Sequence, residues 1–128
     1  MAQSNVDIIR GAYVAFARQD MEALFGAFSP DIVWHTPDSV PWGGTFKGHE
    51  ELGGFFQGVG EALGELRVEP DRYIDGGDVV AVQGHHRGKA PNGNDYDVEW
   101  VMVWDLQDGK VVKFEEAIDS APILAALA

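Results

Sequence analysis

Residues 95–119, DYDVEWVMVWDLQDGKVVKFEEAID, form the segment that decides the fold. In its first half every second residue is apolar, and side chains alternate between the two faces of a strand. One face is therefore apolar throughout and is expected to pack against helices: Tyr96, Val98, Trp100, Met102, Trp104 and Leu106. The other face is apolar only in its middle, at Val101 and Val103, as expected of a surface that meets a partner subunit.

The turn QDGK then decides which residues of the next strand share the apolar face. A two-residue Asp108-Gly109 turn pairs Met102 with Glu115, whereas a three-residue loop with Gly109 in a left-handed bulge position pairs Met102 with Phe114. The first register places Glu115, Ala117 and Asp119 inside, and the second places Val112, Phe114, Glu116 and Ile118 inside. We favour the second register because it matches apolar residues with apolar residues.

That register leaves one carboxylate, Glu116, on an otherwise apolar face. A buried carboxylate resists ionisation unless neighbouring groups compensate it, so Glu116 is the sharpest chemical signal in the chain. The alternative is structural: Glu116 lies at the end of the sheet and forms an outward ion pair. If Glu116 faces solvent, Asp119 becomes the next candidate.

Further elements extend from this hairpin in both directions and define an α+β fold. Apolar spacing predicts helices over residues 5–18, 21–28, 49–63 and within 119–128, and strands over 31–36, 66–74, 78–88, 95–106 and 110–118. Two prolines and three glycines make 37–48 a loop. The order ααβαββββα predicts one domain, 1–128, in which helices pack on one face of a curved, mostly antiparallel sheet.

Composition excludes several classes of function. The 128 residues include 21 acidic and 9 basic side chains, which gives a net charge of −12. Such a surface repels phosphate backbones and anionic lipids, so we expect no nucleic-acid or membrane partner. The chain contains no cysteine, which excludes disulfides and cysteine-based metal sites. The N-terminal segment has neither a basic start nor a long apolar run, so we expect a cytoplasmic protein.

Three stretches resemble a known family. YVAFARQDMEALFGAFSPDIVWHTP at 13–37, GTFKGHEEL at 44–52 and the stretch 97–119 resemble the SnoaL-like branch of the nuclear transport factor 2-like superfamily. The resemblance covers nearly the whole chain and implies a cone-shaped, cystatin-like α+β roll with a deep apolar pocket. It also implies a homodimer formed through the sheet. The superfamily contains cyclases, isomerases, hydrolases, dehydratases and binding domains, so the fold alone does not identify an activity.

The resemblance transfers only part of the known chemistry. Tyr13 falls where ketosteroid isomerases carry an oxyanion-hole tyrosine, but their base falls on Thr36 and their protonated aspartate on Met102. Both acids are therefore missing. In limonene epoxide hydrolases a pocket aspartate falls on Glu116, whereas their arginine and second aspartate fall near Gly84 and His86. The SnoaL-like cyclases use an acidic residue late in the fold, which Glu116 or Asp119 matches.

Strand parity adds His86, which shares the inner face with Val80 and Val82. Its neighbour His85 points to the opposite face, so the two histidines cannot chelate one metal ion, and we expect no metal site. A structural histidine at the sheet edge is the alternative interpretation. The residues expected to act on or contact a ligand are, as catalytic groups, Glu116, His86, Tyr13 and Asp119, and, as substrate contacts, Trp34, Trp42, Phe55, Trp100, Met102, Trp104, Phe114 and Ile118.

The sequence thus predicts a pocket for a small apolar or aromatic molecule. The first hypothesis is an acid–base enzyme without a cofactor, of the polyketide cyclase, isomerase, dehydratase or epoxide hydrolase type, in which Glu116 moves a proton. The second is a ligand-binding or dimeric assembly module of the same fold that lacks catalysis. Under both hypotheses we expect a homodimer through the outer face of the sheet.

Overall fold

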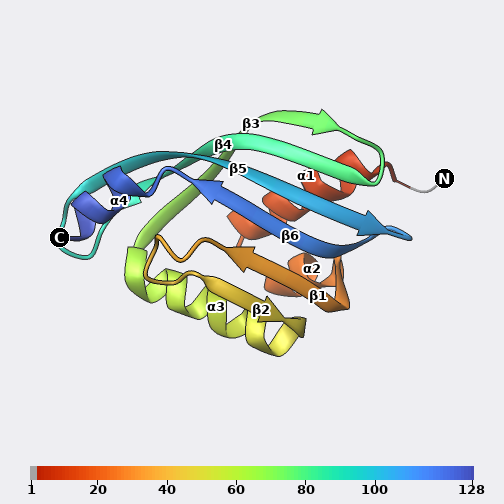
Figure 1. Ribbon diagram of the computed structural model, residues 1–128, viewed down its shortest axis with the longest axis horizontal. Coiled ribbons are helices and arrows are strands. Elements are labelled where there is room, and N and C mark those ends of the chain that lie inside the picture. The colour runs from red at the N-terminus through yellow and green to blue at the C-terminus, as the bar shows by residue number, and fades with distance from the viewer. Residues whose placement is uncertain (1–2) are drawn as a thin grey trace.

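A computed structural model describes residues 3–128. Figure 1 shows its helices and strands along the chain. The helices are α1 (Asn5–Ala17), α2 (Met21–Gly26), α3 (Gly48–Leu63) and α4 (Ser120–Leu127). The strands are β1 (Phe28–Thr36), β2 (Gly44–Lys47), β3 (Glu65–Asp75), β4 (Val79–Lys89), β5 (Asp95–Gln107) and β6 (Lys110–Ile118).

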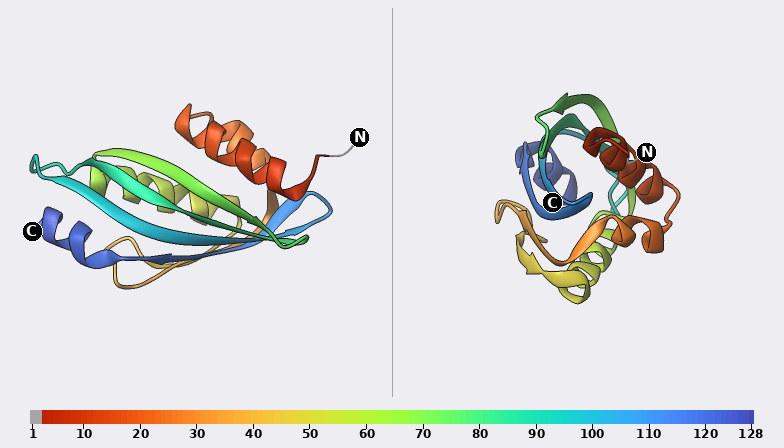
Figure 2. Two further views of the ribbon diagram at one scale, coloured as in Figure 1. Left: turned by 90° about the horizontal axis from the view of Figure 1, so that it is seen from above. Right: turned by 90° about the vertical axis from the view of Figure 1, so that its right-hand side faces the viewer.

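The six strands form one curved sheet in the order β2-β1-β6-β5-β4-β3. Neighbouring strands are antiparallel except β1 and β6, which are parallel. Seen along its length, the sheet curls, and helices α1 and α3 lie on its concave side (Figure 2). The predicted α+β roll, with a bent sheet wrapped on the N-terminal helices, is confirmed.

The predicted faces of β5 are also confirmed. Trp100, Met102 and Trp104 are buried against the concave side, whereas Val101 lies on the outer face with 36% of its surface exposed. The helices begin as the sequence indicates: the Ser4 hydroxyl accepts a hydrogen bond from the Asp7 amide, and this satisfies one of the free donors of the first turn of α1.

Two predictions around β1 are wrong. Phe28, expected in the second helix, begins β1. The stretch 37–48, expected to be a loop, contains β2, which pairs antiparallel with the end of β1. A four-residue strand is too short to show a period of two, and its existence depends on pairing with β1 rather than on its own sequence. The observed order is therefore ααββαββββα.

The turn between β5 and β6 corrects the predicted register. The loop has two residues, Asp108 and Gly109, with φ of 52° and 76°, and not the three that we favoured. Gln107 pairs with Lys110 and Leu106 with Val111, after which the register shifts. This bulge pairs Met102 with Glu116, so neither predicted partner of Met102 is correct.

The bulge explains why the inner face is nevertheless almost the predicted one. An extra residue in one strand reverses its parity, so a two-residue turn followed by a bulge places Phe114 and Glu116 inside. Val111 is buried in place of Val112, which is half-buried, and Ile118 is half-buried at the end of the strand. Within residues 3–128, no helix is long and apolar enough to cross a membrane.

Candidate functional site

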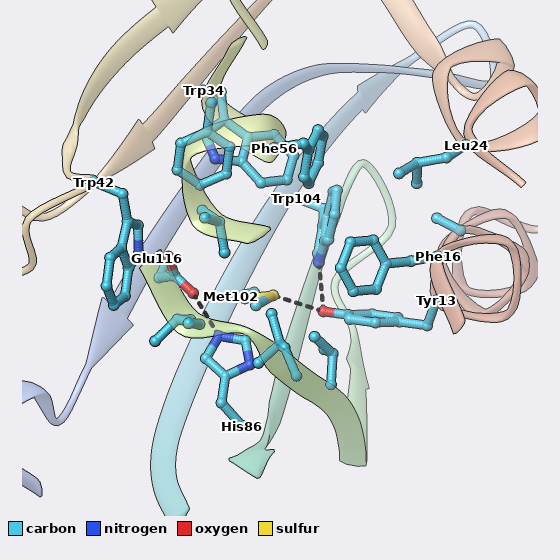
Figure 3. A pocket seen from close by; sticks show the side chains of 16 residues that line it. Tyr13, Phe16, Leu24, Trp34, Trp42, Phe56, His86, Met102, Trp104 and Glu116 are labelled. Atoms are coloured by element: carbon cyan, nitrogen blue, oxygen red, sulfur yellow. Dashed lines mark hydrogen bonds and ion pairs between the residues drawn. The ribbon is translucent and has the colours of Figure 1, made fainter. Parts of the chain in front are cut away.

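A pocket lies between helices α1 and α3 and the concave face of the sheet (Figure 3). Its cavity volume is about 70 Å³, several times the roughly 10–15 Å³ that one water molecule requires. Of the 16 described residues that line it, only Tyr13, His86 and Glu116 carry titratable groups. Most of the other lining side chains are aliphatic or aromatic.

Glu116 projects from β6 into this pocket, and its side chain is 5% exposed. Its two oxygens have different neighbours. The Thr36 hydroxyl donates a hydrogen bond to Oε1 over 3.1 Å, and His86 Nε2 lies 3.5 Å from Oε2. These two contacts compensate the loss of water around a buried carboxylate.

His86 projects from β4, and its side chain is 10% exposed. Among residues 3–128, its Nδ1 is buried with no hydrogen-bond partner. A proton on Nδ1 would be a buried donor without an acceptor, which is costly. A proton on Nε2, facing Glu116, therefore suits the surroundings better than one on Nδ1. The distance of 3.5 Å between His86 Nε2 and Glu116 Oε2 is longer than a normal hydrogen bond. Both groups therefore remain able to form a hydrogen bond with a ligand atom.

Thr36 is fully buried at the end of β1. Its Oγ1 accepts a hydrogen bond from Trp34 Nε1 over 3.3 Å, so Trp34, Thr36 and Glu116 form a chain of hydrogen bonds. Sequence reasoning treated Thr36 only as a position that lacks an acid. Trp34 and Thr36 lie two positions apart on the same face of β1, but no feature of the sequence pairs them with Glu116.

Tyr13 lies on the opposite side of the pocket from Glu116 (Figure 3). Trp104 Nε1 donates to its hydroxyl over 3.1 Å, and the hydroxyl donates to the Met102 sulfur over 3.0 Å. Burial raises the pKa of Tyr13 well above its usual range, and negative charge on Tyr73 and Glu116 raises it further, against the lowering effect of the Trp104 hydrogen bond. Tyr13 is therefore a protonated hydrogen-bond donor at neutral pH.

The structure brings most of the predicted ligand contacts together. Trp34, Trp42, Phe55, Met102 and Trp104 line the pocket with Tyr13, His86 and Glu116. Trp42 reaches it from the loop between β1 and β2 and lines the same pocket as Glu116 (Figure 3). A side chain at Gly43 would overlap the Pro37 carbonyl, so this glycine allows the loop to fold back and carry Trp42 to the pocket.

Four predicted site residues lie elsewhere. Trp100 stacks behind the Tyr13 ring, at 5.9 Å between ring centres, and Phe114 is fully buried against Trp34. Ile118 and Asp119 lie at the end of the sheet and line a different depression. Asp119 is exposed and its amide donates to the Glu99 carbonyl, so the structure does not bring it to Glu116.

Sequence reasoning also missed part of the pocket wall. The additional lining residues come from the helices and from β3: Ala12, Phe16, Leu24, Phe56, Val59, Leu63, Leu66 and Val68. Phe56, Val59 and Leu63 lie in the predicted helix over 49–63, whose apolar residues recur at helical spacing. Such spacing cannot distinguish a helix that packs against a solid core from one that walls a cavity.

Comparison with known proteins identifies the relatives of this architecture. The SnoaL-like domain family matches residues 9–114. A crystal structure described as an NTF2-like protein of unknown function, from Burkholderia pseudomallei, is 32% identical over 99% of both chains, with a TM-score of 0.93.

Two further structures are similar. TerC, co-crystallised with polyporic acid, is 28% identical over 96% of this chain and 97% of its own, with a TM-score of 0.90. A protein with a cystatin-like fold from Xanthomonas campestris is 25% identical over 98% of this chain and 97% of its own, with a TM-score of 0.85. No match was found among curated proteins.

Proposed function

This chain belongs to the SnoaL-like domain family, and on that premise we propose that its pocket binds a small apolar or aromatic molecule and moves a proton on it without a cofactor. The observation that carries the proposal is the pair of Glu116 and His86, 3.5 Å apart and buried at the wall of an apolar pocket. Paired acid and base groups in such a pocket are typical of sites that transfer protons.

The wall of the pocket supports the class of ligand. Aromatic rings of Trp34, Phe55, Phe56 and Trp104 face a cavity whose titratable groups are confined to three residues. Such a surface favours a flat, mostly apolar molecule with one or two polar atoms. The relative TerC, co-crystallised with polyporic acid, supports an organic molecule of this kind.

The proposed step is a proton transfer beside a carbonyl group. Glu116 takes a proton from the carbon next to the carbonyl, and the electron pair of the broken C–H bond moves onto the carbonyl oxygen. Tyr13 donates a hydrogen bond to that oxygen as its negative charge develops. Return of the proton from Glu116 to another carbon of the same conjugated system, as the electron pair moves back from the oxygen, completes an isomerisation. His86 stabilises the Glu116 carboxylate before the first transfer and after the second.

The Tyr13 hydroxyl suits this role because of its present acceptor. A thioether sulfur is a weak acceptor, so a carbonyl oxygen or an oxyanion in the pocket competes successfully with Met102 for the same hydrogen. Trp104 Nε1 donates a hydrogen bond to the hydroxyl oxygen of Tyr13. The hydroxyl hydrogen of Tyr13 therefore points away from Trp104. Tyr13 is therefore held as a donor before a ligand arrives.

Hydrogen–deuterium exchange tests the proposal without knowledge of the natural substrate. Aromatic and cyclic ketones are incubated with the protein in D₂O, and NMR follows loss of the C–H signal beside the carbonyl. We expect exchange above the buffer rate for ketones that fit, and a decrease of about 10²–10⁴-fold in Glu116→Gln, the range of general acid–base catalysis.

Glu115→Gln is the matched control, because Glu115 is the neighbouring carboxylate on the outer face, paired with Lys113. It should exchange ketone hydrogens at the wild-type rate. Ketones that bind to the protein but exchange equally fast with wild type and Glu116→Gln would contradict catalysis and support a binding module.

We also infer that two copies associate through the outer face of the sheet. Val101 and Val79 are exposed there, at 36% and 40%, beside the half-buried Val103. Sedimentation at tens of micromolar, where a stable homodimer persists, should give twice the mass of the chain. Val101→Lys should then shift the protein to the monomer, whereas a wild-type monomer at that concentration would contradict the inference.

A further inference from the structure

We propose that Thr36, oriented by Trp34, is a positioning residue that determines which oxygen of Glu116 exchanges a proton. Thr36 holds Oε1 as a permanent acceptor, and Oε2, opposite His86, is the oxygen that takes and releases the proton. This inference rests on the proposed function of Glu116, but it concerns a different residue and is tested without a ligand.

The direction of the hydrogen bonds follows from the chemistry of the donors. An indole nitrogen only donates, so the bond between Trp34 Nε1 and Thr36 Oγ1, at 3.3 Å, has the hydroxyl oxygen as acceptor. The hydroxyl has one hydrogen left to place. Thr36 has no exposed surface, so bulk water does not compete, and Glu116 Oε1 lies 3.1 Å away. The hydroxyl hydrogen therefore points at Oε1.

This direction makes the two oxygens of Glu116 unequal. A proton placed on Oε1 would meet the hydrogen of Thr36 and would leave the Thr36 donor without an acceptor, at a cost typical of a lost buried hydrogen bond. A proton on Oε2 displaces no hydrogen bond of normal length, because His86 Nε2 lies 3.5 Å away. Figure 3 shows this second oxygen directed toward His86.

The strands hold Thr36 in place. β1 and β6 are parallel, with Trp34 opposite Phe114 and His35 opposite Glu115. The same register brings Thr36 beside Glu116 on the inner face. The Trp34 ring stacks on Phe114 with 3.6 Å between ring centres and an angle of 19°, which fixes the direction of its N–H. Positioning groups on packed strands keep their geometry better than groups on loops.

Carbon-13 NMR of the glutamate carboxyls tests this role directly in the free protein. A donor to the ionised form favours ionisation, so Thr36→Val should move the titration midpoint of Glu116 upward by about one pH unit, a tenfold change in its protonation equilibrium. Thr36→Ser retains the hydroxyl and should restore the wild-type midpoint. Thr45→Val is the control, because Thr45 bonds to His35 on the exposed side of β1, and should leave the midpoint unchanged.

An unchanged midpoint in folded Thr36→Val, or failure of Thr36→Ser to restore it, would overturn the proposal. If Thr36→Val does not fold, Trp34→Phe provides the second variant. Without the indole donor the hydroxyl of Thr36 is free to turn, so the titration midpoint of Glu116 should rise by less than in Thr36→Val. No rise would contradict the relay, that is, the chain of hydrogen bonds from Trp34 through Thr36 to Glu116. A crystal structure at atomic resolution below the midpoint should show the longer carbon–oxygen bond at Oε2, and a longer bond at Oε1 would refute the assignment.

The outcome is separable from that of the proposed function. The predicted midpoints with no ketone exchange would support the relay and contradict catalysis. Ketone exchange that depends on Glu116, together with a Glu116 titration midpoint that is the same in wild type and Thr36→Val, would support catalysis and overturn the relay.

Discussion

Two buried hydroxyl groups in this protein have the same kind of donor, a tryptophan indole, and different acceptors. Thr36 and Tyr13 each accept a hydrogen bond from a tryptophan, Trp34 and Trp104 respectively, and each must then donate its own hydrogen onward. Thr36 donates to the carboxylate of Glu116. Tyr13 donates to the sulfur of Met102. The acceptor decides what each hydroxyl does.

A carboxylate is a strong acceptor and a thioether a weak one. Thr36 is therefore committed to Glu116 and serves to orient it, whereas Tyr13 remains available to a ligand oxygen. Under the proposed function, this difference gives one small pocket both a fixed proton-transfer group and an exchangeable donor. It also ranks the energetic consequences of removing each contact.

Thr36→Val should have the largest effect on stability in this comparison. The variant leaves the indole of Trp34 without its acceptor and the carboxylate of Glu116 without its donor, so the free energy of unfolding should fall by about 2–3 kcal/mol. Urea denaturation measures this change. Thr36→Ser should lose less than half as much, and equal losses in the two variants would show that the methyl group, and not the hydroxyl, stabilises the fold.

Tyr13→Phe should have a smaller effect, because only the Trp104 indole loses a partner of consequence. We expect a loss of about 1–2 kcal/mol in the free energy of unfolding, measured by the same denaturation. Affinity for ligands with a carbonyl group should fall as well. A variant that binds such ligands as tightly as the wild type would exclude Tyr13 as their donor.

Met102→Leu should change stability least among the pocket variants, by less than about 1.5 kcal/mol, because it preserves volume and removes a weak acceptor. Thermal unfolding followed by circular dichroism is sufficient to measure it. A loss as large as that of Thr36→Val would mean that the sulfur is a strong partner of Tyr13 and that the comparison between the two hydroxyls fails.

The adjacent histidines provide a comparison across the sheet, with the smallest expected effect. His86 faces the pocket, whereas His85 on the outer face forms a 2.7 Å ion pair with Asp97. The hydrogen bond to Asp97 raises the pKa of His85, and the same bond lowers the pKa of Asp97.

The signs of these shifts define a pH window for the outer pair. Its contribution is present below the unfolded pKa of histidine and is lost as pH rises through the raised pKa of His85. It is also lost as pH falls through the lowered pKa of Asp97. The pair should therefore stabilise the protein most between about pH 4 and pH 6.5. Denaturation of Asp97→Asn across this range should show its largest deficit inside the window, and a pH-independent deficit would contradict the assignment.

Strand parity predicted the faces of β5 and the inward direction of His86, because side-chain alternation is a local property. The inward direction of Glu116 was predicted from a three-residue loop, and in the structure a two-residue turn with a bulge produces it. The type of turn between β5 and β6 could not be predicted in this way. A two-residue turn followed by a bulge directs Phe114 and Glu116 inward as the predicted three-residue loop does, and the two differ in whether Val111 or Val112 is buried. The pattern of apolar residues cannot separate them. The short strand β2 was missed for a related reason, since it exists only through its pairing with β1.

The role of Thr36 could not be predicted from the sequence. It depends on the parallel pairing of β1 with β6, two strands that are separated by most of the chain. The residue types alone, a threonine two positions after a tryptophan, are unremarkable. Non-local register is what converts them into a relay to Glu116.

Crystals soaked with aromatic ketones and organic acids test the central claim, that Glu116 and His86 face the ligand in the apolar pocket. We expect a ligand whose ring lies among Trp34, Phe55 and Trp104 and whose polar atom lies about 3 Å from Glu116 Oε2 or His86 Nε2. A ligand that fills the pocket with only its apolar part near Glu116, and its polar atoms directed to solvent, would contradict it.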